Sequence, residues 1–386
     1  MDFITQREPL LAELGLFSGV VEVRPTDPMS EFANISFRPE GDGCELTASS
    51  GEIGLRSRIA AQVKGQGLLN APVGLLAAWL KEGRHENVSF TQTEDTWVRV
   101  RCGGNKTRIP VRVGEPPRLE SPPGEPACSV TGEILATLIR TGSYGMPGAA
   151  DATVSTAGAQ IEVQGSSVRI VSSDHSRLAW ASADWREGAD EGADAEEVAE
   201  PPAKQAFGLN RKTLMQLGQL ARAGGERPAM RFFEGGNHLF FEFGERLLVC
   251  SKLADRLPDY EHVIPRDCAV RVKVNRSALL AAVQAAMPFA TGDFSRARLD
   301  IGDDAMNIHV LSVRGEAQGS VEVVESAGTP LALHINLVHL RDFGKVVDAE
   351  EVTLGCDSPD TAFLLSPVDG DSAVRHFCVG MPLAAA

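Results

Sequence analysis

The chain has 386 residues, of which 43% are hydrophobic, and a formal net charge of −15 at pH 7. This length allows two or three domains, each with its own core. We expect a cytoplasmic protein, because no apolar run has the length or flanks of a signal peptide or a membrane helix. The seven cysteines are scattered singly, which argues against a zinc site and against a disulfide framework.

The acidic charge restricts how this chain could hold nucleic acid. Proteins that bind DNA by electrostatics alone are usually basic, because neutralised phosphates supply most of the non-specific affinity. Much of the excess negative charge lies in DWREGADEGADAEEVAEPP, at about residues 184–202. Its composition predicts a solvated, disordered loop; a second interpretation is a segment that repels or mimics nucleic acid. Either DNA is not the partner, or something other than net charge holds it.

Two linkers divide the chain into three segments of similar length. Gly114–Pro126 is rich in proline and glycine and cannot form a regular element, and the shorter Pro265–Val270 follows the unusual stretch KLADRLPDYEHVIP. We therefore expect three domains, at residues 1–124, 125–266 and 267–386, with the acidic stretch as an insert in the second.

Each segment opens with a short β-like stretch, a polar cap and an amphipathic helix. Thr5 and Glu8 have the spacing of a capping box, and Thr131 is the expected cap in the second segment. The apolar residues recur at the spacing of a half-buried helix. The predicted inward-facing residues are Leu10, Leu11, Leu14, Phe17, Ile134, Leu135, Leu138, Ile139, Leu279, Leu280, Val283 and Met287.

A second helix recurs in each segment, after Asn70, Asn210 and Asn336, and each asparagine is a predicted N-cap. Short alternating stretches follow and predict antiparallel strands and hairpins. A repeat of about 125 to 145 residues is longer than a solenoid repeat, so the units are domains. The predicted fold is α+β, with three similar domains that each contain two β-α-β-type half-repeats.

Three doubled domains in a row leave free strand edges at both ends, which proteins avoid exposing. Pairing the first domain of one chain with the third domain of another closes a head-to-tail, two-fold symmetric dimeric ring. A ring holds DNA by topology, so it needs only a lightly basic lining and tolerates an acidic exterior.

Five stretches carry a resemblance to a known family: REPLLAELG with EVRPTDPM, SSDHSRLAW, KLADRLPDYEHVIP, FSRARL and VGMPL. With these, in family order over essentially the whole chain, the protein resembles the bacterial sliding clamp, the β subunit of DNA polymerase III. The resemblance implies helices around a central hole and sheets outside. It implies a DNA-replication processivity factor that has no catalytic site, cofactor or metal. The implied partners are double-stranded DNA, the DNA polymerase III α subunit, the clamp loader, other proteins with clamp-binding motifs and a second copy of the chain.

The resemblance also implies residues that contact DNA phosphates. Arginine, lysine and asparagine at helix starts can reach phosphate oxygens, helped by free backbone N–H groups. The alternative for each residue is an ordinary exposed side chain. The implied DNA-binding residues are Arg24, Arg211, Lys212, Phe294, Arg296 and Asn336.

A hydrophobic groove for short peptides is the second implied site, and the dimer interface is the third. Leu, Val, Pro and Met suit an apolar peptide anchor, although plain core packing is the alternative for these residues. The implied groove residues are Ser173, His175, Arg177, Leu178, Pro258, His262, Val263, Val379, Met381 and Pro382. The implied dimer contacts are Arg108, Ile109, Pro288 and Phe289.

Three departures from the family pattern concern the groove. His175 stands where the family has glycine, His262 replaces a basic residue, and residues 153–158 lack the expected arginine and aromatic side chains. We expect an altered peptide preference. The departures also leave open an alternative function, a specialised or decoy clamp paralogue that binds few standard partners.

Catalytic patterns are weak throughout the sequence. Ser173, Asp174 and His175 are neighbours, but adjacent strand residues point to opposite faces and do not converge as a catalytic triad does. CGGNKT lacks P-loop spacing, and DIGDDAMN lacks the pattern of a calcium loop. A hydrolase is the least favoured interpretation.

Overall fold

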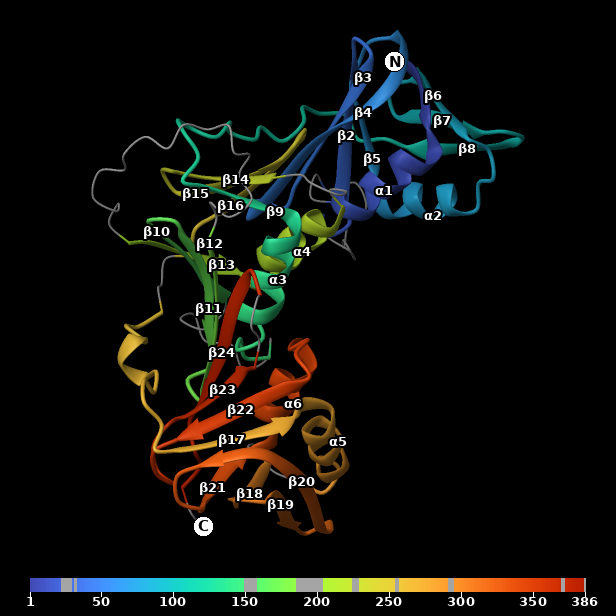
Figure 1. Ribbon diagram of the computed structural model, residues 1–386. Coiled ribbons are helices and arrows are strands. Elements are labelled where there is room, and N and C mark those ends of the chain that lie inside the picture. Colours follow the sequence, from blue (N-terminus) through green and yellow to red (C-terminus); the bar gives the residue numbers. More distant parts are fainter. Residues whose placement is uncertain are drawn as a thin grey trace. The chain divides into compact units, whose positions relative to one another are not determined.

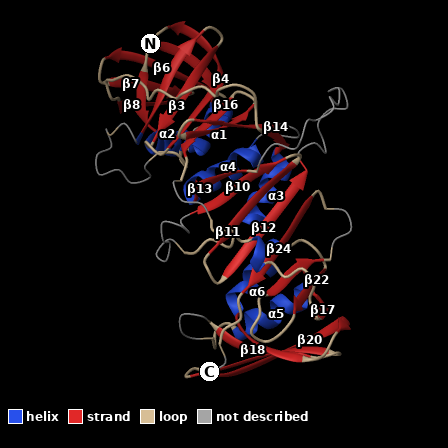
Figure 2. Ribbon diagram, turned by 90° about the vertical axis from the view of Figure 1, so that its left-hand side faces the viewer, coloured by secondary structure: helices blue, strands red, loops and turns tan. Residues whose placement is uncertain are grey.

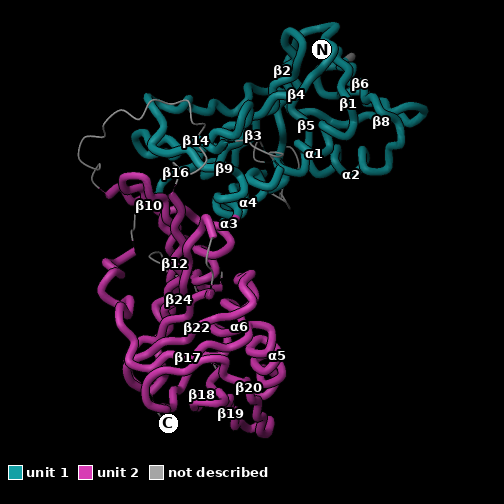
Figure 3. Tube along the Cα trace, viewed as in Figure 1, with its two compact units in different colours: residues 1–136, 211–252 teal, residues 137–210, 253–386 magenta. Residues whose placement is uncertain are grey.

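The computed structural model describes residues 1–21, 30, 33–148, 158–184, 204–223, 229–253, 257–290, 295–368 and 372–384 (Figure 1). The chain forms two compact units, residues 1–136 with 211–252 and residues 137–210 with 253–386 (Figure 3). Each unit combines strands from two neighbouring sequence segments. The division into three domains therefore stays a prediction.

Unit 1 (residues 1–136 and 211–252) contains one antiparallel sheet of twelve described strands. Nine of them follow the order β8-β7-β6-β1-β4-β16-β15-β14-β9, and a branch from β4 continues through β3 and β2 to β5. Pairing of β4 with β16 sets Leu55 opposite Leu248 and joins strands that are far apart in sequence. The strands are β1 (Asp2–Gln6), β2 (Asn34–Glu40), β3 (Gly43–Ser49), β4 (Ile53–Gly65), β5 (Leu69–Pro72), β6 (Asn87–Glu94), β7 (Trp97–Cys102), β8 (Asn105–Pro110), β9 (Cys128–Thr131), β14 (Ala229–Gly235), β15 (His238–Phe243) and β16 (Arg246–Ser251).

Unit 2 contains a second antiparallel sheet of twelve described strands, in the order β13-β10-β11-β12-β24-β23-β22-β17-β20-β19-β18-β21. Pairing of β12 with β24 again joins distant parts of the chain. The strands are β10 (Gly158–Gln164), β11 (Ser167–Ser173), β12 (Arg177–Asp184), β13 (Gln205–Asn210), β17 (Val270–Asn275), β18 (Arg296–Ile301), β19 (Ala305–Ser312), β20 (Gly315–Ala327), β21 (Leu331–Asn336), β22 (Glu351–Cys356), β23 (Phe363–Pro367) and β24 (Val374–Gly380).

In both units, helices contact one another and strands of the same unit (Figure 2). In unit 1, α1 contacts α2, α4 and β4; in unit 2, α5 contacts α6 and β20. No helix in the described ranges is long and apolar enough to cross a membrane. The helices are α1 (Arg7–Phe17), α2 (Val73–Lys81), α3 (Gly132–Gly142), α4 (Arg211–Ala223), α5 (Arg276–Ala286) and α6 (Leu337–Val346).

The amphipathic pattern of the first helix in each segment predicted the buried faces well. Four of the twelve predicted side chains are only half-buried: Leu11, Ile134, Leu280 and Met287. The other predicted residues are buried: Leu10, Leu14, Phe17, Leu135, Leu138, Ile139, Leu279 and Val283. The helical period therefore identified the core side of each helix.

Side-chain caps confirm part of the capping prediction. Thr131 Oγ1 accepts a hydrogen bond from the amide of Ile134 at 3.3 Å, which caps α3. The side chain of Asn336 accepts from the amide of Val338 at 2.9 Å, which caps α6. Both residues satisfy helix N–H groups that have no partner within the helix.

Two other predicted caps are wrong. Thr5 lies in β1 and donates to the carbonyl of Ala60 at 2.8 Å, and Gln6 is the N-cap of α1 without a side-chain bond. Asn70 lies in β5, and α2 begins at Val73 after the N-cap Pro72. The Asn70 amide instead donates to the carbonyls of Arg112 and of the linker residue Gly114, at 3.1 and 2.8 Å. Strand-to-strand and strand-to-linker bonds take these side chains away from the helix ends.

Candidate functional site

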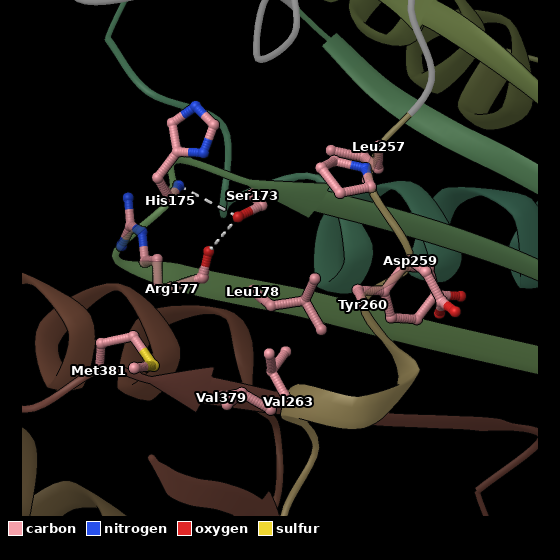
Figure 4. A pocket seen from close by; sticks show the side chains of 11 residues that line it. Ser173, His175, Arg177, Leu178, Leu257, Asp259, Tyr260, Val263, Val379 and Met381 are labelled. Carbon is pink, nitrogen blue, oxygen red and sulfur yellow. Dashed lines mark hydrogen bonds between the residues drawn. The ribbon is translucent and has the colours of Figure 1, made fainter. Parts of the chain in front are cut away.

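A groove of about 250 Å³ opens in unit 2 (Figure 4). It contains eight of the ten groove residues predicted from sequence; His262 and Pro382 are not in its lining. Leu257, Asp259 and Tyr260 line the groove as well, although the sequence reasoning did not choose them. The full lining is Ser173, His175, Arg177, Leu178, Leu257, Pro258, Asp259, Tyr260, Val263, Val379 and Met381.

The floor of the groove is apolar because two strands place their buried residues side by side. Leu178 of β12 pairs with Val379 of β24, and both belong to a buried cluster with Val171 and Tyr260. Two residue pairs further along the ladder, the rings of Trp180 and Phe377 stack at 4.6 Å. An apolar floor with a few polar groups at its rim is typical of a site that takes a hydrophobic peptide anchor.

The turn before β12 forms one end of the groove (Figure 4). Ser173 Oγ donates to the carbonyl of Arg177 at 2.8 Å and accepts from the amide of His175 at 3.1 Å. Asp174 accepts from the amides of Ser176 and Arg177, both at 3.0 Å. His175 has a φ of 70°, a left-handed conformation that costs a non-glycine residue about 1 kcal/mol. The turn therefore presents an imidazole to the groove at an energetic cost.

Arg177 belongs to an ion-pair network and does not offer an unpaired charge to a ligand. Its guanidinium lies 2.9 Å from Asp174 and 2.8 Å from Asp342 of α6, and its side chain is 7% exposed. Breaking such a buried pair from one side leaves a carboxylate without its cation. Arg177 thus holds the groove turn against α6.

His339 of α6 is buried behind the same turn. Its Nε2 lies 3.2 Å from Ser176 Oγ. Burial, reinforced by the nearby Arg177 guanidinium, lowers the pKa of His339 to about 4. The imidazole is therefore neutral at physiological pH.

The two predicted groove residues outside the lining lie close to it. His262 is in the 3₁₀ turn Glu261–Val263, with Nδ1 3.8 Å from the carboxylate of Asp259 and its side chain exposed. Pro382 directly follows Met381, whose amide donates to the carbonyl of Ser176 at 2.8 Å. Tyr260 was not among the predicted groove residues, although KLADRLPDYEHVIP contains it. A large aromatic side chain between Asp259 and Glu261 was the feature that could have identified it.

Several predicted residues lie outside the described part of the chain. These are Arg24, Phe294, the first five residues of the stretch 153–158, and all but the start of the acidic insert. Among the DNA-facing candidates, Arg211 and Lys212 begin α4. The Lys212 ammonium donates to the carbonyl of Val20 at 2.7 Å and to Ser50 Oγ at 3.1 Å. A phosphate would have to compete with these bonds.

Arg296 and Asn336 are brought together by the sheet. They are directly paired residues of β18 and β21. Asn336 caps α6, and the Arg296 guanidinium donates to the carbonyl of Ala384 at 2.6 Å. Two of the candidate DNA-binding residues thus lie side by side in the sheet.

The candidate dimer residues have different exposures. Arg108 lies on β8, an edge strand among those described, where it pairs with Glu94 at 3.0 Å and lies over the ring of Trp97 at 5.1 Å. Ile109 is 1% exposed and packs within unit 1. A contact made by its side chain across an interface is therefore not available in this structure.

Pro288 and Phe289 adjoin a surface that the sequence reasoning missed. Phe289 is half-buried, and its carbonyl accepts from Ser312 Oγ at 2.6 Å. In the β19–β20 hairpin, Leu311 is 84% exposed and Val313 is 99% exposed. Exposed apolar residues at a hairpin tip are typical of an interface.

The titratable side chains and the cysteines can be compared with the patterns considered in the sequence. No group of three or more His, Cys, Asp or Glu side chains could hold a metal ion there. The seven cysteines are free thiols, and burial raises the pKa of Cys128 and Cys250 to about 12, which keeps them protonated. Asp174 binds Arg177 and does not orient His175.

The chain is similar in sequence to bacterial β sliding clamps over nearly its full length. No family model matches it. The β sliding clamp of Pseudomonas aeruginosa is 26% identical over 376 residues, which cover 97% of this chain and 98% of that protein. The β sliding clamp of Synechococcus elongatus is 23% identical over 375 residues, which cover 95% and 96%.

Solved structures of bacterial sliding clamps share the fold of this chain. The crystal structure of the DNA polymerase III β subunit from Pseudomonas aeruginosa matches with a TM-score of 0.86 at 24% identity and covers 100% of both chains. A crystal structure of the clamp from the same organism bound to griselimycin gives the same values. The decoy alternative is not favoured, since the relatives are named as sliding clamps. The chain is similar to bacterial β sliding clamps over nearly its whole length, in sequence and in fold.

Proposed function

We propose that this protein is a DNA sliding clamp, a ring-shaped homodimer that encircles duplex DNA and tethers the replicative polymerase to its template. It would act as an accessory subunit in replication and would have no catalytic site of its own. The observation that carries the proposal is the match to sliding clamps over the whole chain, in sequence and in fold.

A topological link to DNA also accounts for the acidic composition. The net charge of −15 disfavours tight binding by phosphate neutralisation, but a closed ring does not need it. Arg211, Lys212, Arg296 and Asn336 would then supply weak, sequence-independent contacts that allow sliding.

The groove of unit 2 would receive the peptide segments of partner proteins. An apolar floor and a rim of few charges suit a short hydrophobic anchor. We propose the DNA polymerase III α subunit, the clamp loader and other proteins with clamp-binding motifs as partners, in the cytoplasm.

Ring closure would join β8 of one copy to the region of Phe289 and the β19–β20 hairpin of another. β8 lies at the edge of its sheet among the described strands, and Leu311 and Val313 are highly exposed. Covering both removes a free strand edge and an apolar tip from water.

Loading on circular DNA tests the proposed function. The cognate clamp loader, ATP, the labelled protein and a nicked circular plasmid are incubated and then passed over a sizing column. We expect label to co-elute with the plasmid and to be lost after a restriction enzyme linearises it. Equal retention on circular and linear DNA, or none on either, would contradict the proposal.

A further inference from the structure

The segment Leu257–Val263, which forms one wall of the groove, has almost no backbone ladder to hold it. Residues 257–260 are outside any strand or helix, and the short 3₁₀ turn Glu261–Val263 follows. Figure 4 shows this segment running along one side of the groove with Leu257, Tyr260 and Val263 on it. Its position must therefore come from side-chain contacts.

Two polar residues of β10 hold this wall. Gln160 Oε1 accepts a hydrogen bond from the amide of Leu257 at 3.1 Å, and its Nε2 donates to Glu162 Oε1 at 2.7 Å. The hydroxyl of Tyr260 donates to Glu162 Oε2 at 2.8 Å. The Glu162 carboxylate is thus bonded on both oxygens, to the residue that binds Leu257 and to Tyr260 itself.

Two cationic side chains, Lys204 and Arg169, lie near the Glu162 carboxylate and balance its negative charge. Its side chain is 1% exposed, and Lys204 Nζ lies 3.2 Å from Oε2. Lys204 also lies 3.1 Å from Glu261 of the wall segment, and Arg169 lies 3.8 Å from Glu162 and 4.0 Å from Glu261. Two cations and two carboxylates therefore form one network, which offsets the cost of burying Glu162.

From this geometry we propose that Glu162 is a positioning residue that fixes the Leu257–Val263 wall of the peptide groove and thereby sets its affinity. The inference rests on the proposed function for its biological meaning. The ring of Tyr260 lines the groove, whereas its hydroxyl is bonded inside the protein. Glu162 thus acts on a peptide through the residues that it holds. When the wall is already ordered in the free protein, binding does not have to order it, and the peptide affinity is higher.

Two substitutions test this role. Tyr260→Phe removes only the hydroxyl. Glu162→Gln keeps the size but replaces one acceptor oxygen by an NH2 group, which then faces either the Gln160 donor or the donors of Tyr260 and Lys204. Hydrogen exchange of the free protein reports the wall, and titration with a fluorescent clamp-binding peptide of the replicative polymerase reports the groove. We expect faster exchange in residues 257–263 and about tenfold weaker peptide binding in each variant, since one hydrogen bond to a charged group is lost or opposed.

Matched controls separate positioning from general loss of stability. Tyr144→Phe changes the other tyrosine, which packs against the core of unit 2 outside the groove lining. Glu13→Gln changes a buried glutamate of unit 1 that pairs with Arg246 at 3.0 Å. Both controls should keep wild-type exchange in residues 257–263 and wild-type affinity.

The two readouts distinguish the possible failures. Unchanged exchange in Tyr260→Phe and Glu162→Gln overturns the inference, and so does faster exchange with wild-type affinity. Equal loss of affinity in all four variants also overturns it, because the effect is then global. If the wild-type protein binds no polymerase peptide, the exchange data still decide whether Glu162 fixes the wall, and the failure belongs to the proposed function.

Discussion

The two sides of the groove are held by different interactions. The β12–β24 side is part of a continuous backbone ladder, in which Leu178 and Val379 are paired residues of the sheet. The opposite wall, Leu257–Val263, is held by the side chains of Gln160, Glu162 and Lys204. Backbone pairing tolerates many side-chain changes, whereas a side-chain network depends on each member. Substitutions on the β12–β24 side should therefore mainly change the stability of the protein. Substitutions that affect the Leu257–Val263 wall should mainly change the affinity for a peptide.

The largest effect is expected from the β12–β24 side. Leu178→Ala removes a buried side chain from the apolar floor and should lower the free energy of unfolding by about 3 kcal/mol. Chemical denaturation measures this change. Leu75→Ala, at a position that is 52% exposed, is the matched control and should change stability little. Equal effects at both positions would refute the assignment of Leu178 to a packed floor.

The stability of the protein should also depend on the ion pairs of the turn before β12. Arg177→Met leaves Asp174 without its cation and leaves Asp342 with Arg341 at 2.7 Å. The free energy of unfolding should fall by about 2 to 3 kcal/mol, less than for a fully buried pair because both carboxylates are partly exposed. Thermal unfolding measures the loss. Arg298→Met removes an exposed partner of Asp300 and should be close to neutral. A neutral Arg177→Met would mean that the network does not hold the turn against α6.

Acid should weaken the same turn through His339. Its pKa is about 4 in the folded chain and about 6.5 in an unfolded chain. The unfolded state therefore binds more protons between these values, and stability falls as the pH is lowered through them. From pH 7 to pH 5 the loss should be about 2 kcal/mol.

His339→Gln isolates this contribution. Denaturant titrations at several pH values should show a shallower loss of stability for the variant than for the wild-type chain between pH 7 and pH 5. Parallel pH profiles would show that His339 does not titrate as its burial implies.

The smallest effect concerns His175. Its φ of 70° favours glycine, so His175→Gly should stabilise the protein by up to about 1 kcal/mol. It should also open the end of the groove and strengthen binding of a standard polymerase clamp-binding peptide. Isothermal titration measures the affinity.

Ser295→Gly is the matched control, because Ser295 is the other non-glycine residue with positive φ in the described part of the chain. It should relieve strain without changing peptide affinity. If His175→Gly binds the peptide no better than the wild-type chain, the expected alteration of peptide preference does not come from this side chain.

Local sequence patterns were sufficient for much of the architecture. The apolar spacing identified the buried faces of the helices, and Thr131 and Asn336 were identified as caps, because these features depend on residues three or four positions apart. The stretches SSDHSRLAW and KLADRLPDYEHVIP contained most of the groove lining. Their resemblance to a family supplied this result; residue chemistry alone did not.

Other features depend on which distant strands meet. Thr5 and Asn70 fit the cap pattern, but their partners Ala60 and Arg112 come from other parts of unit 1. Nothing local distinguishes Glu162 from an ordinary strand glutamate. It becomes the anchor of a groove wall because folding brings Tyr260, which is 98 residues away, within 2.8 Å of its carboxylate. Periodicity and caps are short-range properties, whereas burial and long-range hydrogen bonds are set by strand register and packing.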